Sequence, residues 1–234
     1  MSAIFLGFLI GLRHALEADH IAAVAALASR TSTAREALRV GLAWGLGHTI
    51  TLLLVGTVVV VLDAAVPIQF AHYLEFAVGV MLVALGADVV RRVIRDRIHF
   101  HVHGHDSGVV HFHAHTHVDT RGPHQEDAHQ HVHPPGFPYR ALLVGLMHGM
   151  AGSAALILLT LSSVDSIALA LGYMALFGLG SLLGMAALSL AIALPLRATA
   201  RNLTWAHNSL QCALGIASVA LGALLIHTTL NSMA

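Results

Sequence analysis

Five ionisable residues stand within eight positions near the N-terminus, inside an apolar stretch from about residue 4 to residue 27. They are Arg13, His14, Glu17, Asp19 and His20. A charged side chain at the centre of a bilayer costs roughly 2.5–3.5 kcal/mol, so Arg13, Glu17 and Asp19 together would cost about 8–10 kcal/mol. Such groups persist in a membrane when they pair with one another or line a wet, functional cavity. Histidine and carboxylate are ligands for divalent transition metals, so the cluster predicts an intramembrane metal site.

A straight helix cannot aim all of these side chains at one ion. Arg13, Glu17 and His20 would share one stripe, whereas Asp19 would point nearly the opposite way from Glu17. Either the helix is broken or kinked near Gly11, or Asp19 acts from another face by orienting a histidine. An internal Arg13–Glu17 ion pair is the structural alternative to a site role for those two residues.

Two further histidines lie in glycine-rich apolar segments. His48 follows Gly-Leu-Gly and precedes Thr49, and His148 precedes a Gly-Met-Ala-Gly-Ser run that ends at Ser153. Glycines permit close helix approach, which would bring each imidazole against a neighbouring helix. We predict His48 and His148 as metal ligands and Thr49 and Ser153 as accessory groups near the site. A hydrogen bond from each imidazole to a backbone carbonyl is the structural alternative.

The composition places the chain in a bilayer. Apolar residues make up 56% of the 234 positions and charged residues only 10%. All twelve basic residues are arginine, so there is no P-loop lysine, which argues against ATP-driven pumping. The single cysteine, Cys212, lies in an apolar run and is predicted to be a packed thiol without a disulfide partner. Nothing in the charge pattern indicates nucleic acid as a partner.

The hydropathy pattern predicts an all-α polytopic membrane protein with six transmembrane helices. The apolar segments span about residues 3–28, 40–62, 72–93, 140–163, 166–195 and 206–228. Turn signals close the fifth segment from Pro195 to Asn202. Arginines other than Arg13 fall between segments 1 and 2, 3 and 4, and 5 and 6. The positive-inside rule therefore places these connections in the cytoplasm and both termini outside an inner (plasma) membrane.

The two halves of the chain resemble each other, which predicts a three-helix repeat at 1–98 and another at 140–234. Segments 1 and 4 share Gly-Leu-X-His, and segments 3 and 6 share the pattern Gly-X-X-X-Val-Ala-Leu-Gly-Ala. Gly45-Leu-Gly-His48 weakly matches Gly178-Leu-Gly-Ser181, and the offsets are 134, 136 and 133 residues. Because three spans per unit is odd, the second copy must enter the membrane inverted, an arrangement typical of transporters. Recurrent small-residue helix packing is the alternative explanation.

The connection at 99–139 is rich in histidine, and residues 99–133 hold twelve of the nineteen histidines. Low-complexity tracts of His, Gly, Pro and Asp cannot form a core, so we expect a flexible cytoplasmic loop. Neutral imidazoles bind Ni²⁺, Co²⁺, Zn²⁺ or Cu²⁺, and the lack of thiolates argues against Cu(I). The predicted metal-binding positions of the loop are His99, His101, His103, His105, His111, His113, His115, His117, His129, His131 and His133.

The run from Arg13 to Ile21 resembles the H-x4-D-H signature of the nickel/cobalt transporter (NiCoT/NicO) superfamily, and Leu46-Gly-His48-Thr49 resembles its second signature. Segments 1, 2 and 4 are most similar to the shorter, urease-accessory-type nickel permeases. The resemblance implies that His14, Asp19 and His20 select and pass the ion, with His48 beside them. Glu17 departs from the pattern, because many longer members carry Asp there.

The resemblance implies a secondary permease for Ni²⁺ or Co²⁺, without a permanently bound cofactor and with nickel-enzyme maturation proteins as partners. The membrane potential favours import, and export by an efflux member of the same superfamily is the alternative. A membrane-held metal store or metallochaperone, which would use the histidine loop, is an alternative from another class. An intramembrane hydrolase would need His207 to activate Ser153, and it would leave the charged cluster of segment 1 unexplained.

Overall fold

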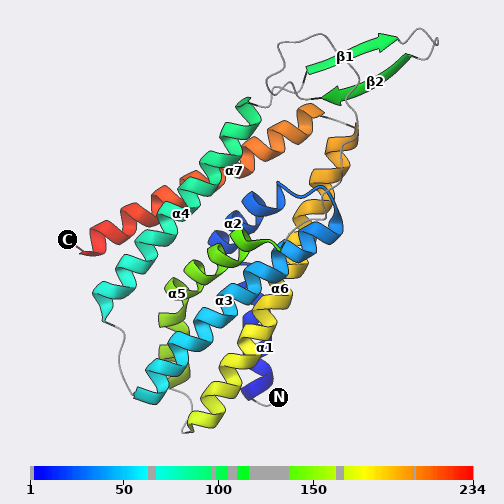
Figure 1. Ribbon diagram of the computed structural model, residues 1–234. Helices are drawn as coiled ribbons and strands as arrows, with labels where there is room; N and C mark the ends of the chain where they lie inside the picture. Colours follow the sequence, from blue (N-terminus) through cyan, green and yellow to red (C-terminus); the bar gives the residue numbers. More distant parts are fainter. Residues whose placement is uncertain are drawn as a thin grey trace.

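The computed structural model describes residues 3–62, 67–95, 99–104, 110–115, 137–161, 166–202 and 204–233. Seven helices and one two-stranded hairpin form in these ranges (Figure 1). In chain order they are α1 (Ala3–His14), α2 (Ala18–Ala28), α3 (Ala34–Leu62), α4 (Ile68–Arg95), β1 (His99–Gly104), β2 (Val110–His115), α5 (Tyr139–Leu161), α6 (Ile167–Asn202) and α7 (Thr204–Met233).

Within the described ranges, four helices are long and apolar enough to cross a membrane. They are α3, most of α4 from Gln69 to Arg95, α6 from Ile167 to Thr199, and α7 from Trp205 to Met233. Each has 27 residues or more and a mean hydropathy near 2, whereas about 20 apolar residues suffice to span the hydrocarbon core. The apolar segments are thus helical, as predicted, and the chain is a membrane protein.

The first apolar segment is two helices rather than one. Helix α1 ends at His14 and α2 begins at Ala18, so the chain departs from helical geometry over Ala15–Glu17. Tight bonds mark the break, since Leu16 N–H donates to Arg13 O and Glu17 N–H donates to His14 O. Glu17 itself is extended, with φ −67° and ψ 149°. Of the two arrangements that the sequence left open near Gly11, the break is the one observed, one turn further on.

Glycines let the helices approach at backbone distance. A Cβ atom at Gly11 would lie 2.1 Å from the carbonyl oxygen of Phe177, so α1 rests directly on α6. A Cβ atom at Gly145 would lie 2.0 Å from the carbonyl oxygen of Trp44, so α5 rests directly on α3. Figure 1 shows α3 between α5 and α6, with α4 beside α7 on the outer side of the bundle. The core that results is built from small side chains around the buried ring of Trp44.

Helix α6 includes the stretch from Pro195 to Asn202, where the sequence predicts a turn. The helix runs through Pro195 and ends only at Asn202. Thr199 supports this last stretch, because its hydroxyl donates to the carbonyls of Pro195 and Leu196 at 3.0 and 2.9 Å. Proline lacks one helix donor, but helices of membrane proteins tolerate a proline in their interior.

The histidine-rich connection contains a β-hairpin, which differs from the flexible loop that its composition predicts. Strands β1 and β2 are antiparallel, and their register pairs His99 with His115, His101 with His113 and His103 with His111. Alternation of histidine with Phe and Val has the two-residue period of a strand, and this local pattern outweighs the low complexity. The predicted loop ligands His105, His117, His129, His131 and His133 lie outside the described residues.

Candidate metal centre

Four histidines from four helices meet in the interior of the bundle. His14 ends α1, His20 lies in α2, His48 in α3 and His148 in α5. The ring of His20 is central, with centroids 4.3 Å from His14, 4.3 Å from His148 and 5.2 Å from His48. His20, His48 and His148 are completely or almost completely buried. The structure therefore brings together the four intramembrane histidines that the sequence singled out.

Several of these imidazole nitrogens are buried without a hydrogen-bond partner among the described residues. They are Nε2 of His14, Nε2 of His20, both nitrogens of His48 and Nδ1 of His148. A buried polar atom left unsatisfied costs about 1–3 kcal/mol, so such a cluster needs a ligand to explain it. His14, His20 and His48 each offer one ligand atom, and these atoms lie within 4.8 Å of one another. This spacing is small enough for one transition-metal ion to bind all three.

Asp19 bridges two of the histidines. Its Oδ1 lies 2.9 Å from Nδ1 of His20, and its Oδ2 lies 3.2 Å from Nε2 of His148. A proton on Nδ1 of His20 would satisfy the first contact and leave Nε2 with its lone pair free for a metal. Asp19, His20 and His148 also form a second group that could hold an ion directly. The carboxylate thus fits both roles, positioning histidines or binding the cation itself.

The break in the first segment creates this arrangement. With three non-helical residues between His14 and Ala18, α2 is free to turn Asp19 toward His148 while His20 faces His14. The same break moves Glu17, whose Oε1 lies 2.9 Å from Nδ1 of His14. The predicted Arg13–Glu17 pair is not among the ion pairs of the described residues, because the two side chains no longer share a helical stripe. Arg13 is exposed on α1.

Aromatic rings close the cluster on two sides, and neither ring was predicted as part of the site. Trp44 is completely buried, with its ring centroid 5.4 Å from His20 and 5.7 Å from His148. Phe177 of α6 covers His14 at 5.1 Å. The sequence does contain one indication of the role of Trp44: it precedes His48 by four residues and so lies on the same face of the helix. These rings exclude water, which strengthens electrostatic interactions at the histidines.

The remaining predicted site residues have other surroundings. The hydroxyl of Thr49 donates to the carbonyl oxygen of Gly178 at 3.0 Å and so links α3 to α6. Ser153 lies in α5, but its side chain is outside the described part of the chain. His207 is engaged on both nitrogens, by the carbonyl of Leu196 at 2.9 Å and by Gln211 at 3.0 Å. It therefore does not match the base that an intramembrane hydrolase would require.

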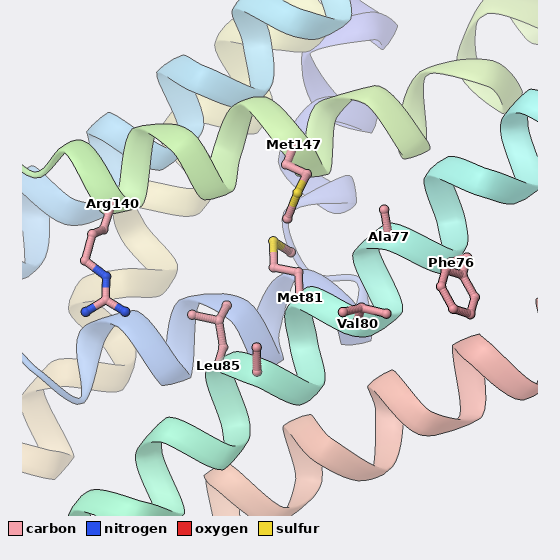
Figure 2. Close-up of a pocket in the computed structure, with 8 residues that line it drawn as sticks. Phe76, Ala77, Val80, Met81, Leu85, Arg140 and Met147 are labelled. Atoms are coloured by element: carbon pink, nitrogen blue, oxygen red, sulfur yellow. The ribbon is translucent and has the colours of Figure 1, made fainter.

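The groove of about 520 Å³ between α4 and α5 is separate from the histidine cluster. Figure 2 shows the two thioethers of Met81 and Met147 pointing toward each other across it, with Arg140 at one end. Its lining is otherwise apolar and includes none of the four histidines: Phe76, Ala77, Val80, Ala84 and Leu85. A hydrated dication has no ligands here, so the groove is not the candidate metal centre.

Comparison with known proteins agrees with a metal-handling role. The family model NicO, described as high-affinity nickel-transport protein, matches residues 1–231. The chain is also similar to the urease accessory protein UreH of Bacillus sp. (strain TB-90), with 32% identity over 223 residues. That alignment covers 95% of this chain and 89% of the relative. No solved structure matches the chain.

Proposed function

Because the chain belongs to the NicO family of high-affinity nickel-transport proteins, a family of transporters and not of enzymes, we propose that it is a secondary permease for Ni²⁺ in a bacterial inner membrane. Co²⁺ is a second substrate of the same site, since imidazole and carboxylate groups bind both ions. The relative is named as a urease accessory protein, and we infer that the nickel carried here likewise serves the maturation proteins of a nickel enzyme.

The observation that carries the proposal is the cluster of unpartnered imidazole nitrogens from His14, His20, His48 and His148. Neutral imidazoles bind a dication without adding charge of their own, and the carboxylate of Asp19 offsets part of the cation's charge. Nickel loses most of its hydration water on entry and gains nitrogen ligands in exchange. The cation is the cargo of this site, so the ligands must also release it.

Equivalent contacts in the two halves support the proposed inverted three-helix repeats. Gly11 of α1 lies against Phe177 O and Ser181 N of α6, and Gly145 of α5 lies against Trp44 O and His48 N of α3. The third helices of the two halves, α4 and α7, also lie against each other through matching glycines. Gly86 lies against Gly215 O and Val219 N, and Gly222 lies against Gly79 O and Val83 N. All of these pairs are related by the offsets seen in the sequence. This symmetry supports the proposal of six spans with a site between the repeats.

Import is the direction that we propose. A membrane potential of about 100 mV, negative inside, draws a dication inward by about 4.6 kcal/mol, which requires no coupled reaction. The arginine-bearing connections support an orientation with the histidine-rich segment 99–139 in the cytoplasm and both termini outside. There, the histidines of the hairpin buffer incoming Ni²⁺, Co²⁺ or Zn²⁺ at the inner mouth of the permease.

Replacing His48 by Gln tests the proposal. The change keeps a polar side chain of similar size in α3 but removes an imidazole that no described residue holds. Radioactive nickel uptake by cells should fall at least tenfold, because one of few ligands is lost (~1.4 kcal/mol per tenfold). His227→Gln, an exposed histidine in α7, is the matched control and should leave uptake unchanged.

Nickel binding to purified protein separates this proposal from a role of the loop. In a Trp205→Phe background, Trp44 is the remaining tryptophan, and its ring lies 5.4 Å from that of His20. Nickel should quench its fluorescence, and His48→Gln should weaken that quenching. Equal uptake and equal quenching in His48→Gln and His227→Gln would contradict the site. In inside-out vesicles the cytoplasmic face of the membrane is on the outside, so nickel that accumulates in their lumen has moved in the direction of export. Such accumulation would contradict the proposed import and leave the proposed site untouched.

A further inference from the structure

Ser181 of α6 is a completely buried serine whose hydroxyl has no partner among the described residues. Two other completely buried serines make a clear contrast. Ser189 donates to the carbonyl of Ala37 at 2.7 Å, and Ser218 donates to the carbonyl of Leu82 at 2.9 Å. Buried hydroxyls are usually satisfied in this way, and an unsatisfied one destabilises the fold. The unpaired hydroxyl of Ser181 therefore needs an explanation outside the packing of the helices.

Ser181 lies beside the histidine cluster. Its backbone nitrogen is 2.9 Å from the Cβ position of Gly11, one turn before His14 on α1. Phe177, one turn earlier on α6 and on the same face, covers the ring of His14. Gly184, one turn after Ser181 on α6, lies against Ala15 at the break between α1 and α2. The serine thus stands on α6 between contacts to His14 and Ala15, the two adjacent residues where the break between α1 and α2 begins.

The second half of the chain has Ser181 where the first half has His48. Gly145 meets the backbone nitrogen of His48 as Gly11 meets that of Ser181. The crossing of α3 and α6 places the two residues at one level, because Gly45 lies against Leu182 and the hydroxyl of Thr49 bonds Gly178. These two contacts bracket His48 on one helix and Ser181 on the other. A histidine and a serine therefore occupy matching positions on either side of the crossing.

We propose that Ser181 is a further group of the cation site, and that its hydroxyl bonds a water molecule retained by the bound Ni²⁺ or Co²⁺. This inference rests on the proposed function. Three imidazoles leave coordination positions open, and water fills them. A hydroxyl is a weaker metal ligand than an imidazole, so a serine at this position holds the cation's water without fixing the cation itself. The site is thereby tight on the His48 side and releasable on the Ser181 side.

Ser181→Ala separates this role from a structural one, with Ser189→Ala on the same helix as matched control. Removing an unsatisfied hydroxyl should leave the Tm of the metal-free protein unchanged or higher, whereas Ser189→Ala should lower it. Nickel affinity, measured by the fluorescence of Trp44, should fall about three- to tenfold in Ser181→Ala only, as for the loss of one hydrogen bond. The KM of uptake should rise with it.

Ser181→Cys supplies a second readout that packing alone cannot produce. A thiolate is a much stronger metal ligand than a hydroxyl, so at this position it should displace the retained water, bind Co²⁺ directly and give a sulfur-to-metal charge-transfer band in the near ultraviolet. Ser189→Cys should give none, and Cys212 of the wild type serves as the blank. Unchanged nickel affinity in Ser181→Ala together with no band in Ser181→Cys would overturn the inference. Wild-type protein that binds no nickel would instead overturn the proposed function.

Discussion

A single carboxylate organises the histidine cluster. Asp19 accepts from the backbone N–H of His20 at 2.8 Å as well as contacting the rings of His20 and His148. The backbone N–H of His20 thus orients the carboxylate of Asp19, and the carboxylate in turn orients the imidazoles of His20 in α2 and His148 in α5. His48 has neither nitrogen held by a described residue, so its orientation depends on packing against Trp44 and the other rings.

Asp19→Asn should impair the site without unfolding the helices. The amide has nearly the same volume, but its NH₂ group can only donate, so one of the two histidines must present a lone pair toward it. The proton arrangement that leaves His20 Nε2 free is then disturbed, and nickel affinity should fall roughly 10- to 100-fold, as for the loss of other groups that orient metal ligands. Calorimetric titration of purified protein with Ni²⁺ measures the change.

Glu17→Gln provides the comparison for that variant. Glu17 contacts His14, but its side chain is 57% exposed, and water can replace the contact. We expect an effect of less than about threefold on affinity, in keeping with the small contribution of exposed pairs. Equal losses of nickel affinity in Asp19→Asn and Glu17→Gln would mean that Asp19 does not orient the histidine ligands.

At the scale of the helices, the site depends on a broken segment held by backbone contacts. Helix α1 rests on α6 at Gly11, and α5 rests on α3 at Gly145, so both histidine-bearing helices are positioned by a glycine one turn before their histidine. At the other end of α2, Asp88 of α4 forms ion pairs with Arg30 and Arg92. These contacts hold α2 at the height where Asp19 reaches His148.

Gly11→Ala should displace α1 and abolish uptake. The new Cβ would lie 2.1 Å from a backbone oxygen of Phe177, which cannot move aside as a side chain could. Overpacking of this kind costs about 1–3 kcal/mol or more, so the Tm should fall by several degrees. Gly172→Ala, also in the bundle but with nothing within 4 Å of the new methyl group, should be neutral in both thermal unfolding and uptake. A neutral Gly11→Ala would remove the argument for close α1–α6 contact.

Much of the helical arrangement was predictable from the sequence, and the parts that were not have physical causes. Long apolar runs require helices in a bilayer, and the position of Asp19, nearly opposite Glu17 on a regular helix, indicates that a straight helix is insufficient. The position of the break was not predictable, because it depends on packing against α6 and α5. Trp44 and Ser181 have ordinary residue types for an apolar segment, so only their tertiary surroundings distinguish them. The low complexity of the histidine-rich segment indicates a flexible loop, and only its two-residue alternation indicates the pairing of β1 with β2.

At the scale of the whole molecule, the proposed function divides metal binding between the buried cluster and the histidine-rich connection. The register of β1 and β2 sets three histidines opposite three others. Imidazoles in water have a pKa near 6.5, so binding by such a segment weakens as the surrounding pH falls below about 6. The buried cluster, by contrast, is covered by the rings of Trp44 and Phe177.

Deleting residues 99–133 separates a permease from a metal store. We expect the initial rate of nickel uptake to stay within about twofold of wild type, because the four clustered histidines lie outside the deleted segment. The amount of nickel that co-purifies with the protein should fall sharply, since twelve histidines are removed. A replacement linker of Gly and Ser of equal length controls for the distance between α4 and α5. Loss of uptake in that linker variant would favour the store.

Asp19 holds one ring from each half of the chain, His20 before the histidine-rich connection and His148 after it. Anything that pulls the two halves apart must lengthen at least one of these contacts and so loosen the ligands around the ion. By thermodynamic reciprocity, an ion that draws His20 and His148 together must also oppose separation of the halves. Loading the cargo and opening the protein are then competing events that share the same two bonds.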